Sequence, residues 1–329
     1  MTWRNVLLGL LLGAVCGLPP ASAQAPKRIG VLLVATACPT PPELVKSLAE
    51  MGWIEGRTVV FDCLSVLGKI DDLPARSAEI VAHKPDVIVS GYIPGIRALK
   101  AATSTIPIVA LNMADPVGQG LIDSLSRPGG NVTGLVSVMF ELESKRIELL
   151  QQALPKMTRL AVVYRKGGDE RYRQSTEQAL AQASKARRFS HKWFYPEKPE
   201  ELPAMFNVIA AEKFDAVYLV PNPTVEGNAV LIGQEVTRHR LPAVGQNSTI
   251  GLNSNITDAG VLLAYGPSTE HIAQRAAAFI DKILKGARPA TLPAEQPTKF
   301  ELIVNLRTAR ALGIAIPQSI LLRADRIIE

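Results

Sequence analysis

The sequence contains few aromatic residues and few histidines, and these shortages exclude several functions. Aromatic residues make up 5% of the 329-residue chain. So small a share does not favour a surface on which the bases of single-stranded nucleic acid stack. The histidines lie far apart in the sequence and form no metal-binding or catalytic pattern; they are His83, His191, His239 and His271. We therefore expect no bound metal.

Motifs of the common enzyme classes are also missing. The sequence has no G-x-S-x-G nucleophile elbow, no P-loop lysine and no C-x-x-C pair. The stretch GQGLID, which follows Asp115-Pro116-Val117, does not match a dinucleotide-binding fingerprint. The net charge of +6 comes from scattered basic residues, and this favours a solvated surface over nucleic-acid binding. We predict neither a cofactor nor a nucleic-acid partner.

The first 25 residues predict an export signal. A single early cation, Arg4, precedes the apolar run 6–18, and Ala21-Ser22-Ala23 forms an A-x-A cleavage site. We expect cleavage after Ala23, which removes residues 1–23 and leaves a soluble periplasmic protein. The apolar run is too short for a membrane anchor, and no later run is long enough. A lipoprotein signal would use Cys16, but GAVC lacks the residues that precede a lipidated cysteine.

The rest of the chain alternates apolar strands with helical patterns, and the rhythm occurs twice. Continuous apolar strands are typical of parallel sheets that helices cover on both faces. KPDVIVSG in the first half corresponds to KFDAVYLV in the second, and each follows the first strand of its half at nearly the same distance, so we predict two copies of one α/β unit. Expected strands are 27–36, 57–66, 85–92, 106–113, 158–165, 188–195, 214–221 and 241–247; expected helices are 42–53, 71–84, 93–103, 144–154, 171–187, 199–213 and 224–239.

A bend separates the halves, and a tail follows the second. Pro128, Gly129 and Gly130 stand together within DPVGQGLIDSLSRPGGNVTGL, and we interpret them as the turn into the strand by which the chain leaves one domain and enters the next. The tail predicts a strand at 260–266, a helix at 268–286, a strand at 299–305 and a helix at 306–313 that Gly313 ends.

Two long motifs give the chain a resemblance to a known family. They are DPVGQGLIDSLSRPGGNVTG (115–134) and EQPTKFELIVNLRTARALGIAIPQSILLRAD (295–325), supported by YGPS (265–268) and ILKGARPATLPAEQP. The sequence is thereby similar to ABC-transporter substrate-binding proteins of the type I periplasmic-binding fold, from Lys27 to Glu329. It departs from them in the segment 244–266, which is longer than the family's usual connection.

The resemblance implies a fold, a function and partners. The fold is α/β, with two doubly wound parallel-sheet domains joined by a three-strand hinge that crosses near Ser137, Tyr265–Pro267 and Pro297–Lys299. The implied domains are 27–137 plus 267–297, and 138–266 plus 298–329. The implied function is the extracytoplasmic solute-binding component of an ABC importer. It binds a small organic solute by hinge closure and delivers it to a membrane permease; we expect a monomer. Helix starts at both rims of the cleft and the positive net charge favour an amino acid or a carboxylate as that solute.

Ligands of open α/β sheets bind beyond the carboxyl ends of the strands. The sharpest local signal is SGYIPGIRAL, where a strand ends and a helix begins within three residues. Free N–H groups and the helix dipole there favour a carboxylate, although an ordinary turn with hydrated N–H groups fits the same letters. The expected ligand-binding residues are Thr36, Ala37, Ser90, Gly91, Tyr92, Asn112, Met113, Ser137, Tyr164, Asn222 and Asn247.

Each of these side chains has an alternative role. Tyr92 and Tyr164 fit a sandwich around a flat ligand or a solvated rim. The asparagines at strand ends suit a polar ligand, but asparagine is also common at turns. Arg165 suits a bidentate contact with a carboxylate, or it is a surface residue.

Cys38 and Cys63 remain once the signal is removed, and an even number in an oxidising compartment suggests a disulfide rather than two buried thiols. Cys38 follows the first strand and Cys63 lies near the end of the second. In a sheet of order 2-1-3 these strands are neighbours, about 4.8 Å apart. We therefore predict a Cys38–Cys63 bridge that holds a loop at the mouth of the cleft.

Other functional classes remain open. A periplasmic ligand sensor would use the same fold, and a secreted hydrolase is a weaker alternative because no nucleophile–base pair is recognisable. We do not predict an enzyme.

Overall fold

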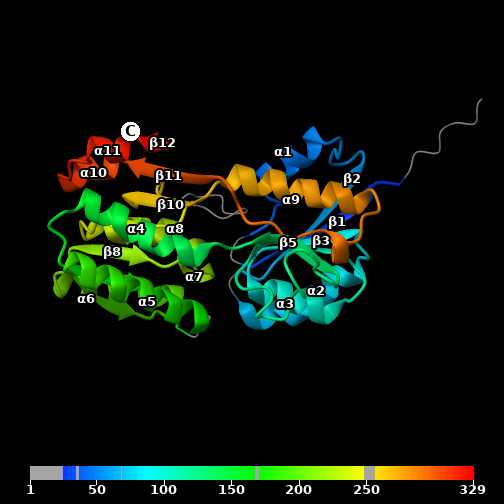
Figure 1. Cartoon of the computed structure of the whole chain (residues 1–329), viewed down its shortest axis with the longest axis horizontal. Helices are drawn as coiled ribbons and strands as arrows, with labels where there is room; N and C mark the ends of the chain where they lie inside the picture. The colour runs from blue at the N-terminus through cyan, green and yellow to red at the C-terminus, as the bar shows by residue number, and fades with distance from the viewer. Residues whose placement is uncertain (1–24, 35–36, 68, 167–169, 248–255) are drawn as a thin grey trace, which may run out of the picture.

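The computed structural model describes residues 25–34, 37–67, 69–166, 170–247 and 256–329 of the chain. These residues form two α/β units that lie side by side, each built on one sheet with helices on both faces (Figure 1). Four clusters of buried apolar side chains fill the spaces between sheets and helices, two in each unit. The predicted α/β fold class with parallel-sheet domains is confirmed.

The first sheet contains five strands in the order β2-β1-β3-β4-β5, all parallel. Its β1 strand pairs with β2 and with β3, so the predicted 2-1-3 order is correct. The elements are β1 (Lys27–Leu33), α1 (Pro42–Glu50), β2 (Val59–Ser65), α2 (Leu73–Ala82), β3 (Val87–Ser90), α3 (Ile93–Ala102), β4 (Ile108–Met113) and β5 (Val132–Val136).

The second sheet contains seven strands in the order β12-β11-β10-β9-β8-β6-β7, and only the β10–β11 pair is antiparallel. Its first elements are α4 (Met139–Ala153), β6 (Arg159–Val163), α5 (Glu170–Arg187), β7 (Ser190–Phe194), α6 (Leu202–Ala211), β8 (Ala216–Leu219), α7 (Pro223–Gly227), α8 (Ala229–Arg238) and β9 (Ala243–Gly245). Its last elements are β10 (Leu263–Pro267), β11 (Phe300–Asn305), α10 (Leu306–Leu312), α11 (Gln318–Leu321) and β12 (Arg326–Ile328).

The internal repeat extends to single side chains. Asp86 precedes β3 and accepts a hydrogen bond from the backbone N–H of Arg28 at 2.8 Å. Asp215 precedes β8 and accepts one from the backbone N–H of Arg159 at 2.9 Å. Each aspartate thus ties the start of one central strand to the next, which is why PDV and FDA recur in the two halves.

The long helix α9 (Thr269–Leu284) packs on the first unit, although the strands before and after it belong to the second sheet. Its apolar face, which includes Ala276 and Ile280, joins the core cluster that also contains Ile29 and Leu44. Figure 1 shows α9 beside α1. The chain therefore passes between the units three times, from β5 to α4, from β10 to α9, and in the segment that leads to β11.

The Arg-Pro-Gly-Gly bend lies one strand before the first crossing between the units. It precedes β5, and β5 is still a strand of the first sheet. The backbone N–H of Gly129 bonds to the carbonyl of Ala290, so the bend lies at the amino edge of that sheet. The three turn-formers reverse the chain into the last strand of the first unit, and the crossing follows at the other end of that strand.

Two elements differ from the sequence prediction. The helix expected over 224–239 is broken at Asn228, which ends α7 and precedes α8. The Asn228 side chain donates to the carbonyl of Thr224 at 2.7 Å, a local bond that competes with helix continuation. The short α11 and β12 were not predicted because their few residues give no clear periodicity. Gly313, at φ 71°, ends α10 in the left-handed conformation as expected.

Within the described ranges, no helix combines the length and the apolar character needed to cross a membrane.

Candidate functional site

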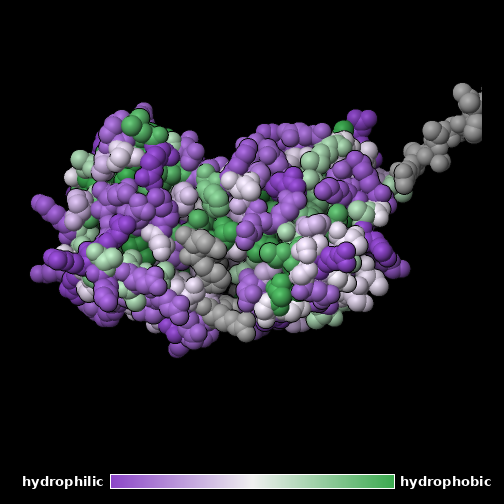
Figure 2. Space-filling view, in the orientation of Figure 1, coloured by the Kyte–Doolittle hydropathy of each residue, from purple (hydrophilic) through white to green (hydrophobic). Residues whose placement is uncertain are grey.

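The carboxyl edges of the two sheets meet at what we call the junction, formed by the segments that follow β3 and β4 in the first unit and β6, β8 and β9 in the second. One direct link across it is a hydrogen bond from the Tyr92 hydroxyl to the carboxylate of Glu226. Tyr92 follows β3, whereas Glu226 lies on α7 directly after β8. In Figure 2, hydrophilic residues cover most of the outer surface and hydrophobic residues are visible beside the junction.

The turn 90–92 joins β3 to α3 in three residues. Ser90 is buried, and its hydroxyl lies 2.9 Å from the carbonyl of Leu32, so its polar group already has a protein partner. Tyr92 adopts φ 59°, a left-handed conformation that is uncommon for a residue with a side chain. The first backbone N–H groups of α3 lie next to Gly91 and Tyr92, and no side chain caps them.

Two residues of the first unit, Asn112 and Met113, end β4. Met113 is fully buried, and its carbonyl accepts a hydrogen bond from the Ser137 N–H at 2.8 Å. Asn112 is half-buried, and none of the hydrogen bonds between described residues uses its side chain. Ala37 is exposed, and Thr36 lies outside the described residues.

Asn222 is an N-cap. Its side-chain oxygen accepts hydrogen bonds from the N–H groups of Thr224 and Val225, and its side-chain nitrogen donates to the carbonyl of Val220. Both polar atoms are therefore used inside the second unit. Asn222 acts on the junction by fixing the start of α7, which carries Glu226.

Asn247 follows β9 and is 1% exposed. Its nitrogen donates to the carbonyl of Pro267 at 3.0 Å, which ties the end of β9 to the crossing strand β10. Its oxygen is buried and has no hydrogen-bond partner within the described part of the chain. That oxygen packs on Gly266, where an added Cβ would lie 2.3 Å from it. A buried acceptor without a donor is costly, so the site suits a ligand or water that donates a hydrogen bond.

Tyr164 and Arg165 follow β6 and point to opposite faces of the sheet. Tyr164 is 3% exposed and makes edge-to-face contacts with Tyr172 and Trp193, at ring-centroid distances of 6.0 and 6.2 Å. The hydrogen bonds from Tyr164 N to Phe194 O and from Lys166 N to Pro196 O continue the strand pairing past Val163. Since alternate residues of a strand face opposite sides, Arg165 lies on the face of Val163.

A buried charge network that the sequence did not reveal lies behind the junction. Glu143 and Arg146, both fully buried on α4, form an ion pair at 3.2 Å. Arg146 also donates to the Tyr265 carbonyl at 2.7 Å and to the Gln246 side chain at 3.0 Å, while Glu143 accepts from the Tyr172 and Tyr218 hydroxyls. The network therefore joins α4, which follows the first crossing, to β10, which precedes the second.

Burial raises the pKa of Glu143 above its ordinary value, although Arg146 and the Tyr172 hydroxyl oppose this effect. Burial and the Glu143 carboxylate raise the pKa of Tyr172 well above its ordinary value. A sequence signal did exist, because Glu143 and Arg146 share a helix face with Ile147 and Leu150, which are core residues. In the sequence the charged run that contains them is typical of a solvated helix.

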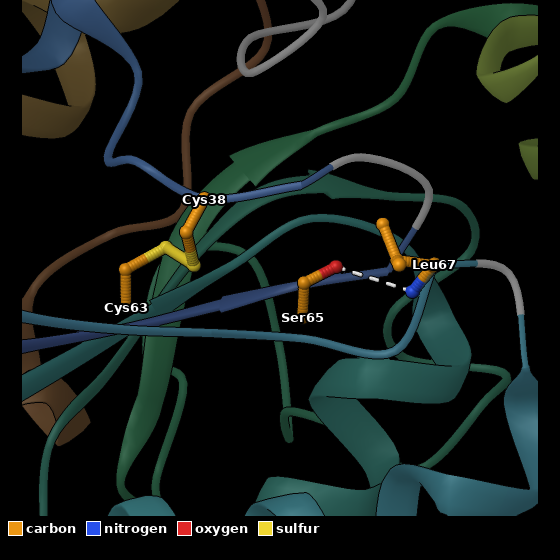
Figure 3. Close-up of a disulfide and its surroundings, with 4 residues drawn as sticks. All are labelled: Cys38, Cys63, Ser65 and Leu67. Atoms are coloured by element: carbon orange, nitrogen blue, oxygen red, sulfur yellow. Dashed lines mark hydrogen bonds between the residues drawn. A yellow bond between two sulfur atoms is a disulfide. The ribbon is translucent and has the colours of Figure 1, made fainter.

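The structure joins Cys38 and Cys63 by a disulfide with a Cα–Cα distance of 5.8 Å (Figure 3). Cys63 lies inside β2 opposite Val31 of β1, and Cys38 reaches it from the loop after β1. Beyond Cys63 the strand ends in a turn where the Leu67 N–H donates to the Ser65 hydroxyl at 3.1 Å. The bridge thus anchors the loop after β1, which lies at the carboxyl edge of the first sheet.

The two described cavities lie away from the junction. One of 460 Å³ is at the amino edge of the first sheet, between Asn131 and Arg288, and one of 390 Å³ is at the opposite end of the second unit, between Arg240 and Arg307. Across the described ranges, no three His, Cys, Asp or Glu side chains are grouped as metal ligands would be.

A two-unit fold with a junction between the carboxyl edges of its sheets is the architecture of solute-binding proteins. The chain belongs to the family of ABC transporter substrate binding proteins, whose model matches residues 43–328. Solute binding is therefore its role.

Three comparisons describe its relatives. A tyrosine-binding protein of Clostridioides difficile (strain R20291) is 22% identical over 82% of this chain and 75% of the relative. A Streptococcus pneumonia ABC domain solved in complex with L-Trp is 24% identical, with a TM-score of 0.78 over 92% of this chain and 100% of the other. A conserved domain protein from Vibrio cholerae O1 biovar eltor is 26% identical, with a TM-score of 0.78 over 92% of this chain and 99% of the other.

Proposed function

We propose that the chain binds an amino acid or a related small carboxylate at the junction and delivers it to the membrane permease of an ABC importer. Family membership supports the transport role. The observation that carries the location is the hydrogen bond between Tyr92 and Glu226, because it joins the two edges at which ligands of open α/β sheets bind.

The chemistry of the junction supports an amino acid as the solute. The turn 90–92, Asn112 and Arg165 offer hydrogen-bond donors, while Glu226 and the buried oxygen of Asn247 accept. Two relatives are named or described for amino acids, one as a tyrosine-binding protein and one in complex with L-Trp. A ligand with both donors and acceptors satisfies both kinds of group.

Closure of two domains around the solute follows from the same architecture. We assign residues 27–137 plus 267–297 to the first domain and residues 138–266 plus 298–329 to the second. The packing of α9 on the first sheet supports this division. With three chain segments between the domains, a rotation about them opens and closes the junction.

We also propose that the protein is periplasmic and monomeric, with its signal removed after Ala23. Residues 1–24 lie outside the described residues, so the support is the sequence pattern and the family's extracytoplasmic role. An oxidising compartment also suits the Cys38–Cys63 bridge. A ligand sensor on the same fold is the second candidate, and we expect no catalysis.

A thermal-shift screen of the purified mature protein tests this function. The panel contains the twenty standard amino acids, the corresponding amines and acids of the aromatic ones, and a set of neutral sugars. A true ligand at about one hundred times its Kd stabilises the folded state by about 2.7 kcal/mol. We expect at least one amino acid to raise the melting temperature and to be recovered unchanged afterwards. Turnover of the compound contradicts the proposal, and so does a panel without any shift.

A further inference from the structure

We infer that Glu226 and Arg165 form a zwitterion-recognition pair, in which Glu226 binds the α-ammonium group of the solute and Arg165 its α-carboxylate. The inference rests on the proposed function and specifies its chemistry. It assigns both charged contacts to the second unit, whereas the sequence placed the anion site at the start of α3 in the first.

Glu226 brings a negative charge to the junction. It is 7% exposed and lies on α7, whose start Asn222 fixes with two hydrogen bonds. Its carboxylate accepts a hydrogen bond from Tyr92, on the opposite side of the junction. A buried carboxylate repels the carboxylate of a solute at short range and attracts its ammonium group. The Glu226 carboxylate therefore favours a cationic group at the junction.

Arg165 brings the matching positive charge. It follows β6, which neighbours β8 in the sheet with Val163 opposite Leu219. The strand pairing continues to Lys166, so Arg165 projects to the face of Val163, and Val225 belongs to the same cluster of buried side chains on that face. Arg165 directly follows β6 and Glu226 lies on the helix directly after β8, so both lie at the carboxyl edge of neighbouring strands.

Arg165 is half-buried, and no ion pair or hydrogen bond between described residues includes its side chain. The neighbouring Lys166, in contrast, is exposed and paired with Glu197. A guanidinium with a fixed fork of donors suits a carboxylate that is bound through both oxygens. One basic and one acidic group thus follow neighbouring strands, and an α-amino acid carries a carboxylate and an ammonium group on one carbon.

Matched ligands separate the two contacts. The probes are L-tyrosine, tyramine, which lacks the carboxylate, and 3-(4-hydroxyphenyl)propionate, which lacks the ammonium group. If another standard amino acid binds more tightly in the panel, its amine and acid replace them. Affinities are measured by titration calorimetry with the wild type, Glu226→Gln and Arg165→Gln, and circular dichroism establishes that each variant is folded.

We expect Glu226→Gln to lower the affinity for L-tyrosine about 30-fold or more. The affinity for the propionate should change by less than about 3-fold, since that ligand lacks the ammonium group that Glu226 binds. We expect Arg165→Gln to lower the affinity for L-tyrosine by a similar factor and to leave the affinity for tyramine unchanged. Lys166→Gln and Glu197→Gln are the controls of equal charge change, and we expect neither to alter L-tyrosine binding.

The outcomes distinguish this inference from the proposed function. The pair is wrong, while the proposed function stands, if an amino acid binds and either of two results is found. The first is that Glu226→Gln lowers the affinity for all three ligands equally, and the second is that Arg165→Gln leaves the affinities unchanged. If only neutral sugars bind, or nothing in the panel binds, both the amino-acid class and the pair are overturned.

Discussion

The two units share a backbone plan but differ in how charge is distributed within them. Both have the strand order 2-1-3-4, and both use an aspartate to join neighbouring strands, Asp86 in one and Asp215 in the other. Among the described residues, the buried charged side chains are Glu143, Arg146, Glu226 and Glu235, all in the second unit. The first unit instead has a disulfide at the corresponding edge.

Duplication of the fold has therefore not duplicated its chemistry. The repeated parts are those that the sheet requires, namely apolar strands and the aspartate at the strand start. The carboxyl edges carry the differences, because the side chains there are not constrained by the sheet and are available for a ligand. In our account the first unit supplies Tyr92 and backbone donors, and the second supplies the charges.

The largest effect should come from breaking the charge network of the second unit. Arg146→Met leaves the Glu143 carboxylate buried without its cation, and we expect a loss of about 3–5 kcal/mol in the free energy of unfolding. Urea unfolding followed by tryptophan fluorescence measures it. Lys145→Met is the control, since Lys145 forms a partly exposed pair with Glu148 on the same helix. A loss no greater than that of the control would show that the network adds nothing to stability.

Removing the disulfide should be the next largest effect, and it should act on the first unit. The bridge joins residues 25 apart in the sequence, and in the chain-entropy model its loss costs about 3 kcal/mol. We expect Cys38→Ser/Cys63→Ser to unfold at lower urea concentration than the oxidised protein. Mass spectrometry of the unreduced exported protein is the accompanying test. Two free thiols in that material refute the bridge.

A smaller effect is expected for Tyr92, measured on binding rather than on folding. Tyr92→Ala removes the hydroxyl that meets Glu226 and the ring beside it, and we expect solute affinity to fall by about 1–3 kcal/mol. Tyr92→Phe separates the two contributions, because it keeps the ring. Titration calorimetry with L-tyrosine, or with the best amino acid from the panel, gives both values. Unchanged affinity in Tyr92→Ala places this residue outside the binding site.

The smallest effect should come from the helix cap that positions Glu226. Asn222→Ala removes the cap of α7, and we expect a stability loss of about 1 kcal/mol. Because α7 carries Glu226, solute affinity should also fall, although Asn222 touches no solute in our account. Asn305→Ala removes the cap of α10 and is the matched control. If the two variants lose equal stability and neither loses affinity, Asn222 has no role at the junction.

Much of the fold was predictable from the sequence. Continuous apolar strands such as 85–92 indicated parallel sheets, and the recurrence of the aspartate segment indicated two units. The helix break at Asn228 was not predictable, because a local side-chain bond overrides an otherwise regular helical pattern. The bend 128–130 was predictable as a turn, but glycine and proline do not indicate which edge of a sheet the turn joins.

The candidate site was less predictable than the fold. Strand ends indicated the edge at which we place the candidate site, and Tyr92, Arg165 and Asn247 follow such strand ends. The sequence did not reveal that Asn222 is committed to a helix cap, or that Glu226 reaches Tyr92 from the other unit. Those facts depend on which side chains meet across the junction, and residues 134 apart in the chain give no local signal of their contact.

Small-angle scattering with and without solute tests whether the two units close on a solute at their junction. The mature protein is measured alone and with L-tyrosine, or with the best amino acid from the panel, at a concentration where calorimetry shows the site to be filled. Our account predicts a smaller radius of gyration in the bound state, because rotation about the three crossing segments brings the units together. An unchanged scattering profile at full occupancy would contradict it.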